Sequence, residues 1–222
     1  MTTDDFGIEP RGKRRVAWWV TALAIIVAVL VVTFLRDAGP GEQTGALLTA
    51  DDFGAGYEVE VMTGEQLGQA NSGTDLPEGI EPAECAELLA ARPAPTGADT
   101  ASGVAASGDG AAYLELLMPA DGVTAWDTDR LGEVVDTCRT TTYDDGDSTG
   151  TVEFGHLPAP VADGFGLTAR ISSGDGVVTL GVAVSRVGEH VVVLTGVATG
   201  DLDEREFTRL VAAANDRVSA QV

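Results

Sequence analysis

The sequence predicts an α+β domain: an antiparallel β-sheet with helices packed mainly on one face, preceded by one transmembrane helix. Three observations support this prediction. An apolar run near the N-terminus carries no charge, several later segments have apolar residues at helical spacing, and the last third of the chain consists of β-rich runs joined by glycine-containing turns. Helices and strands that are segregated along a chain are typical of α+β domains.

The transmembrane helix is predicted at residues 16–35, which are uncharged throughout. As a helix this run is about 30 Å long, which is the thickness of the hydrocarbon core of a bilayer. It is longer than the apolar region of a signal peptide, and it ends in Thr33-Phe34-Leu35, where cleavage would require small residues. We therefore predict an uncleaved signal anchor, and a long signal peptide cut near Ala38 is the alternative.

Basic residues set the predicted orientation. They are concentrated before the apolar run, at Arg11, Lys13, Arg14 and Arg15. Only Arg36 follows the run closely. Because the excess of Lys and Arg stays on the cytoplasmic side, the N-terminus is predicted to lie inside the cell membrane and the rest outside. The predicted divisions are a cytoplasmic tail, a membrane anchor, a polar linker and one extracytoplasmic domain, at residues 1–15, 16–35, 36–45 and 46–222.

The first half of the outer domain is predicted to mix short helices with strands. The stretch "LLTADDFGAG" indicates a short helix capped by Thr49, and residues 57–61 ("YEVEV") alternate as a half-buried strand does. Pro82 is well placed to begin a helix. A strand is predicted at 111–118 ("AAYLELLM"), and an amphipathic helix is predicted at about 125–138.

Two cysteines lie on the apolar faces of these two predicted helices. Cys85 shares its face with Leu88 and Leu89, and Cys138 ends a stripe of apolar residues at helical spacing. An even number of cysteines in an oxidising compartment favours a disulfide. Redox-active pairs are usually close in sequence, as in C-x-x-C, and these are not. We therefore predict a structural Cys85–Cys138 disulfide that ties the two helices together.

The second half of the domain predicts a β-meander followed by one helix. The β-rich runs are at residues 151–157, 166–172, 176–187 and 190–198. Between them, residues 173–176 and 187–190 are predicted hairpin connections. The last helix is predicted to begin near Asp203, which has capping-box spacing to Glu206.

This order of elements is carried most clearly by four stretches: "LLTADDFGAGY", "PAECAELL", "AAYLELLMPADGVTAWDTDRLGEVVDTC" and "SRVGEHVVVLTGVA". Together they resemble the extracellular sensor domain of mycobacterial membrane Ser/Thr kinases of the PknH type and of related actinobacterial lipoproteins. The resemblance covers nearly all of residues 46–222 and implies ligand binding rather than catalysis. The chain departs from that family in two respects. It has cysteines for one disulfide where two are common, and residues 1–15 are too short to hold a kinase.

Charge and missing motifs exclude several classes of function. The net charge is −22, and the only lysine is Lys13. Such a surface repels nucleic acid, which needs clustered cations. The chain has no H-E-x-x-H motif, and residues 46–222 contain no lysine for an S-x-x-K mechanism. The sequence therefore predicts a non-catalytic domain with no cofactor and no nucleic-acid partner.

A candidate ligand site is a strand face built from small residues. The face consists of Thr179, Gly181, Ala183 and Ser185, with Gly196 from the next run. Small side chains leave a shallow trough on a sheet, and a ligand could lie in it. The alternative is that a helix packs closely against this face.

A second, weaker candidate is a calcium site in "YDDGDSTGTVE". Asp145, Asp147 and Thr149 alternate and are followed by Gly150, as at the opening of a calcium-binding loop. The twelfth position of such a loop, however, is His156 instead of a bidentate acid. The loop is therefore incomplete, and an acidic surface turn is the alternative to a metal site.

These observations favour a single-pass, membrane-anchored extracytoplasmic domain that binds an unknown small ligand or an envelope protein. The alternative is a structural or assembly subunit of a cell-envelope complex that acts through protein–protein contacts. An enclosed apolar cavity would favour ligand binding, and a large exposed apolar patch would favour assembly. A cleft with perturbed titratable groups would favour an enzyme.

Overall fold

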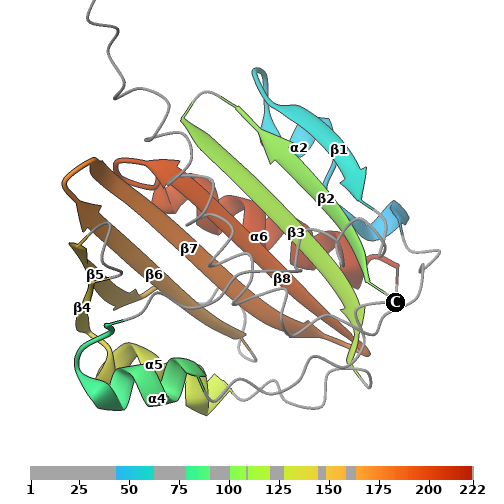
Figure 1. Cartoon of the computed structure of the whole chain (residues 1–222). Helices are drawn as coiled ribbons and strands as arrows, with labels where there is room; N and C mark the ends of the chain where they lie inside the picture. Colours follow the sequence, from blue (N-terminus) through green and yellow to red (C-terminus); the bar gives the residue numbers. More distant parts are fainter. Residues whose placement is uncertain are drawn as a thin grey trace, which may run out of the picture.

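One antiparallel β-sheet forms the centre of the domain (Figure 1). The computed structural model describes residues 44–62, 79–90, 101–108, 110–120, 128–144, 149–158 and 164–221. The strands are β1 (Glu58–Met62), β2 (Ser102–Ser107), β3 (Ala111–Pro119), β4 (Thr140–Asp144), β5 (Thr149–His156), β6 (Gly164–Ser173), β7 (Gly176–Val187) and β8 (His190–Thr199). The helical elements are η1 (Thr44–Ala46), α2 (Ala50–Phe53), α4 (Ala83–Ala90), α5 (Thr128–Thr137) and α6 (Glu204–Ser219).

The strand order is β1-β2-β3-β8-β7-β6-β5-β4, and every neighbouring pair is antiparallel. Helices flank this sheet, so the predicted α+β class with an antiparallel sheet is confirmed. The predicted membrane span at 16–35 lies outside the described residues. None of the described helices is long and apolar enough to cross a bilayer.

Both predicted hairpins are confirmed. Ser173 pairs with Gly176 where β6 turns into β7, and Val187 pairs with His190 where β7 turns into β8. Gly188 has a φ of 59°, a conformation that residues with a side chain rarely adopt, so a glycine suits this tight turn. The three long strands β6, β7 and β8 therefore form a continuous meander in the middle of the sheet, between β3 and β5.

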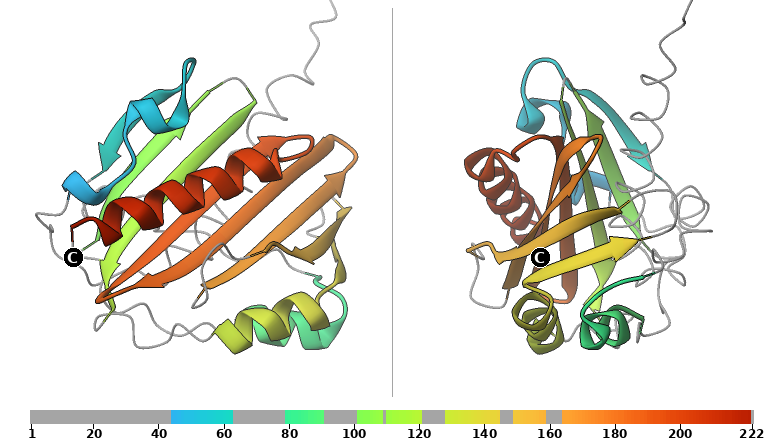
Figure 2. Two further views of the ribbon diagram at one scale, coloured as in Figure 1. Left: turned by 180° about the vertical axis from the view of Figure 1, so that it is seen from behind. Right: turned by 60° about the vertical axis from the view of Figure 1, so that its left-hand side comes forward.

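Helix α6 covers one face of the sheet, over β7 and β8 (Figure 2). It begins at the predicted cap, because the carboxylate of Asp203 accepts hydrogen bonds from the backbone N–H groups of Arg205 (3.0 Å) and Glu206 (3.1 Å). The residues of its buried stripe are Phe207, Leu210, Val211, Ala214, Asn215 and Val218. Apart from Asn215, this stripe is apolar and forms one side of the main core.

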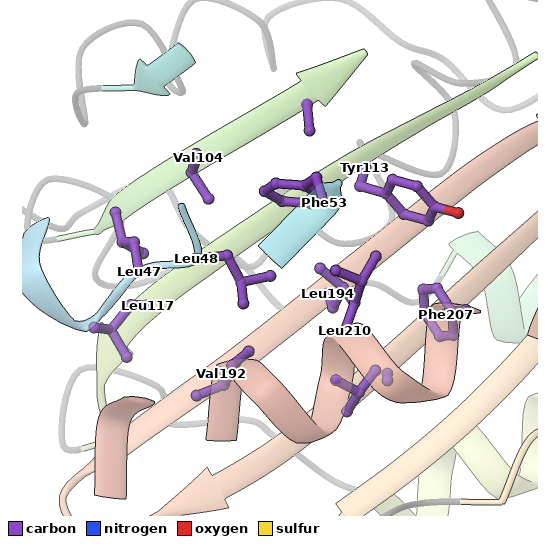
Figure 3. Packing of buried hydrophobic residues seen from close by; sticks show 14 of the residues in the cluster. Leu47, Leu48, Phe53, Val104, Tyr113, Leu117, Val192, Leu194, Phe207 and Leu210 are labelled. Atoms are coloured by element: carbon purple, nitrogen blue, oxygen red, sulfur yellow. The ribbon is translucent and has the colours of Figure 1, made fainter. Parts of the chain in front are cut away.

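The segment η1–α2 packs beside α6 on the same face and completes this core (Figure 3). Leu47 and Phe53 are almost fully buried there. The predicted Thr49 cap of α2 is present: Thr49 donates to the carboxylate of Asp52 from its backbone N–H (2.7 Å) and from its hydroxyl (2.8 Å). The cap fixes the turn that directs Phe53 into the core.

The opposite face is covered in part by α5, which packs on β5 and β6 and is itself contacted by α4. Leu131 and Val135 of α5 join a second core cluster with Leu167 of β6. Leu167 pairs with Val182, whereas the next residue of β7, Ala183, lies in the cluster beneath α6. The helices therefore divide between the two faces, because both faces of the long strands are apolar, whereas the sequence predicted helices mainly on one face.

Two strands were not predicted from the sequence. β2 ("SGVAAS") consists of small residues and β4 ("TTTYD") is rich in threonine. Neither has the run of large β-branched or aromatic residues by which a strand is usually recognised. They are defined instead by pairing, β2 between β1 and β3, and β4 along β5.

The predicted disulfide joins Cys85 of α4 to Cys138, which directly follows α5. The two Cα atoms are 5.2 Å apart, and both cysteines are fully buried. Thr141 of β4 lies beside them, and its hydroxyl donates to the carbonyl of Cys138 at 3.1 Å. The disulfide thus fastens α4 and α5 to one another and to the end of the sheet.

Replacing both cysteines with alanine is expected to lower the free energy of unfolding by about 4 kcal/mol, the chain-entropy value for a loop closed over 53 residues. Chemical denaturation of the full-length protein in detergent measures this loss, with the oxidised wild type as reference. A loss below about 1 kcal/mol would mean that the unfolded chain is scarcely constrained by the disulfide.

Candidate functional site

The small residues predicted as a ligand trough lie together on one face of β7 and β8, beneath α6. Leu202 and Phe207 fill the space that the glycines leave. A Cβ atom on Gly181 would lie 2.6 Å from Leu202 Cδ2, and one on Gly196 would lie 2.9 Å from Phe207 Cδ2. Helix packing, the alternative that the sequence left open, therefore occupies this face. Ligand binding at these five residues stays a prediction.

The polar members of this face also have partners within the fold. Ser185 accepts a hydrogen bond at 3.2 Å from the side-chain amide of Asn215 on α6. The hydroxyl of Thr179 donates to the carbonyl of Gly200 at 2.6 Å. Ala183 belongs to the core cluster beneath the helix. These contacts make the face part of the interior and direct the search for a site elsewhere.

Substituting Gly196 with alanine is expected to lower the free energy of unfolding by about 1–3 kcal/mol, because the new methyl group would press on the buried rings of Phe207 and Tyr113. Thermal and chemical unfolding measure the change. Gly174→Ala is the matched control, since nothing lies within 4 Å of its added Cβ. Equal stability of the two variants would contradict the close packing of α6.

The predicted calcium ligands are only partly placed. Asp145 and Asp147 lie outside the described residues. Thr149 begins β5, is exposed and pairs with Asp144 of β4. It lines a hollow of about 690 Å³ together with hydroxyl-bearing residues of β4 and β6. Among the described residues, no group of three or more His, Cys, Asp and Glu side chains is arranged to hold a metal ion.

A second hollow lies on the sheet face turned away from α6 and has a volume of about 510 Å³. We name it the β1–β8 hollow, because strands β1, β2, β3 and β8 form its floor. The residues that give it its chemistry are Glu58, Glu60, Met62, Ala105, Leu114 and Thr195. Its lining is mainly apolar with a few polar groups, which is typical of small-molecule sites.

The strand register explains the shape of this hollow. Glu60 lies opposite Ala105, Ala105 opposite Leu114, and Leu114 opposite Thr195, so these side chains form one row across four strands. The neighbouring row runs from Glu58 through two small residues, Ser107 and Ala112, to Val197. The β2 members of the two rows, Ala105 and Ser107, have small side chains. The hollow is therefore deepest over β2, and larger side chains surround it.

Thr195 is an unusual residue in this floor. Its side chain is 3% exposed, and its hydroxyl has no hydrogen-bond partner among the described residues. A buried hydroxyl without a partner costs about 1–3 kcal/mol, and such groups are rare in native proteins. Thr195 lines the hollow, so a molecule bound there is a candidate partner for this hydroxyl.

A buried carboxyl group, Glu115, lies on the other face of β3. It is fully buried, and its Oε2 accepts a hydrogen bond from the backbone N–H of Leu48 at 2.7 Å, while Oε1 has no partner among the described residues. Burial raises the pKa of Glu115 to about 7, against the lowering effects of that hydrogen bond and of Arg217. The sequence interpretation overlooked this residue, although alternation along "YLELL" places it with the buried Tyr113 and Leu117.

Glu115 makes stability depend on pH. Because its pKa rises from 4.5 to about 7 on folding, the folded state holds the proton more tightly, and stability is lost as pH rises from about 4.5 through 7. Relative to Glu115→Gln, the wild type is expected to lose about 3 kcal/mol over this range. Urea unfolding of both proteins over a pH series measures the difference.

The control for this measurement is Glu87→Gln, which changes an exposed carboxyl group on α4. Its stability is expected to follow that of the wild type at every pH. Parallel pH profiles of the wild type and Glu115→Gln would contradict a raised pKa of Glu115 in the folded protein.

The chain is similar to the crystal structure of the extracellular domain of PknH from Mycobacterium tuberculosis. The two sequences are 12% identical, the match covers 77% of this chain and 93% of that chain, and the TM-score is 0.44. The sequence predicted this similarity. It is also similar to a putative uncharacterized protein, an Rv0999 ortholog, from Mycobacterium smegmatis (18% identity, 74% of this chain and 92% of that chain, TM-score 0.47). No curated protein sequence matches it. The family model described as "Domain of unknown function (DUF5642)" matches residues 47–195, and the chain belongs to this family.

Proposed function

We propose that this member of the DUF5642 family is a single-pass membrane protein whose extracytoplasmic domain binds a small ligand without catalysing a reaction. One observation carries the proposal: the β1–β8 hollow is lined by Thr195, whose buried hydroxyl has no partner among the described residues. Sites for small molecules are concave and mainly apolar, with a few polar groups that fix the orientation of the ligand. The β1–β8 hollow fits this description.

The location of the domain is supported by the disulfide and by the N-terminal sequence. A buried structural disulfide persists in an oxidising compartment, which lies outside the cytoplasm. The uncharged run at residues 16–35, with basic residues before it, supports an anchor whose N-terminus is cytoplasmic. Both observations support an extracytoplasmic position for residues 46–222.

Ligand binding is favoured over assembly by the described surface. An assembly subunit would need a large apolar patch for a stable partner. Of the large apolar residues that the structure describes, only Val61 is exposed, with 53% of its surface accessible. The non-catalytic part of the proposal is supported by the sequence, which lacks the H-E-x-x-H metal motif and has no lysine in residues 46–222 for an S-x-x-K mechanism.

Native mass spectrometry of the full-length protein tests the proposal. The protein is expressed in an actinobacterial host and released from detergent micelles in the instrument. The wild type is expected to carry an excess mass that is lost on denaturation. Ala105→Phe should lack this mass, because a phenylalanine ring at this half-buried position, between Glu60 and Leu114, would fill the hollow.

The matched control is Ala212→Phe, which places the same ring on the exposed side of α6. This variant should retain the bound mass. Binding in the hollow is contradicted if the wild type carries no excess mass, or if Ala105→Phe carries the same excess mass as the wild type. The assembly function would then be the one to pursue, by crosslinking the full-length protein in membranes.

A further inference from the structure

We infer that the β1–β8 hollow binds an elongated amphiphilic cation: a molecule with a protonated amine at one end, an apolar body, and a hydrogen-bonding group at the other end. The inference rests on the proposed ligand-binding function and names the chemical class of the ligand. It is carried by three features of the hollow: two carboxyl groups on β1, an apolar floor, and the hydroxyl of Thr195, which has no partner within the described part of the chain.

The carboxyl groups lie together at one side of the hollow. Glu58 and Glu60 are two positions apart on β1, so their side chains lie on the same face of the sheet. Their neighbours on β2 are Ser107 and Ala105, which offer no opposite charge. None of the described lining residues is a lysine, arginine or histidine. A ligand cation would therefore supply the charge that these carboxyl groups lack.

The apolar floor separates the carboxyl groups from the hydroxyl. Ala105 and Leu114 lie between Glu60 and Thr195 in the same cross-strand row. Met62 lies at the side of the hollow, and its flexible, polarisable side chain adapts to apolar ligands of different shape. This floor disfavours a hydrated metal ion, which needs several oxygen ligands, and favours an organic body.

The hydroxyl of Thr195 marks the other end of the site. It is at the far side of the row, three strand spacings from Glu60, or roughly 14 Å along the sheet. Both side chains can reach inward, so the ligand is somewhat shorter than this distance. Because a threonine hydroxyl both donates and accepts, it can pair with an alcohol, a phenol or a carbonyl group. A molecule lying along the row would satisfy both of its ends.

Three soluble probes separate these contributions. 4-(4-Aminobutyl)phenol has an amine and a hydroxyl at opposite ends of an apolar body. 4-Phenylbutylamine lacks the hydroxyl, and 4-(4-hydroxybutyl)phenol lacks the amine. Each is titrated into the full-length protein in lipid nanodiscs, with methionine methyl groups labelled with ¹³C. The Met62 methyl resonance reports binding in the hollow, and that of Met118, which is 1% exposed in the core, is the internal reference.

The expected result is that 4-(4-aminobutyl)phenol shifts the Met62 resonance saturably and binds at least about tenfold more tightly than either of the other probes. Glu58→Gln with Glu60→Gln should weaken both amines by about tenfold and leave 4-(4-hydroxybutyl)phenol unchanged. Thr195→Val should weaken the two phenols and leave 4-phenylbutylamine unchanged. The matched control is Glu87→Gln with Glu133→Gln, which removes the same charge from exposed positions on α4 and α5 and should change nothing.

Two results would overturn the inference. One is equal affinity of the charged and neutral probes, or an affinity for the amines that the Glu58→Gln, Glu60→Gln pair does not alter. The other is the absence of any Met62 shift with all three probes. Neither result bears on the mass-spectrometric test, in which a bound mass lost from Ala105→Phe would still support ligand binding in the hollow, by a molecule of another class.

Discussion

The close approach of α6 to β7 and β8 is the contact on which the rest of the domain depends. It is possible because Gly181 and Gly196 have no side chain, so that Phe207 lies directly against the strands. Each large apolar side chain buried in this way contributes about 1.5–3 kcal/mol, and the stripe on α6 has several. Once this face is closed by the helix, the opposite face is left to α5 over β5 and β6 and to the hollow over β1, β2, β3 and β8.

Local patterns in the sequence predicted the elements with strong periodicity. The stripe of α6, the hairpins from β6 to β8, and the two cysteines at helical spacing from apolar residues were all recognised, because these features depend on residues near one another in the chain. β2 and β4 were missed because their residues are small or hydroxylic and are held by their neighbours in the sheet. The small residues on β7 and β8 predicted a close approach, but no sequence pattern says whether a helix or a ligand makes it.

The candidate site itself could not be predicted, since it depends on pairing between distant strands. Thr195 meets Leu114 only because β8 pairs with β3, and β1 joins through β2. On the other face of the same strand pair, Glu115 lies opposite Leu194. Shifting one strand by a single residue would exchange the faces of all these side chains. Buried polar groups on both faces therefore restrict the pair to one register.

The pairing of β3 with β8 also governs the order in which the chain can fold. A ribosome completes β1, β2 and β3 long before β8, and β3 has no other partner on that side in the sheet. Until residue 199 has been made, the backbone N–H and C=O groups on this edge of β3 stay unpaired, and α6 does not yet exist to cover the core. Such unpaired edges invite aggregation, and long-range pairings form slowly. The nascent domain therefore keeps an unpaired strand edge and an uncovered core until its last fifth, with β8 and α6, has been synthesised.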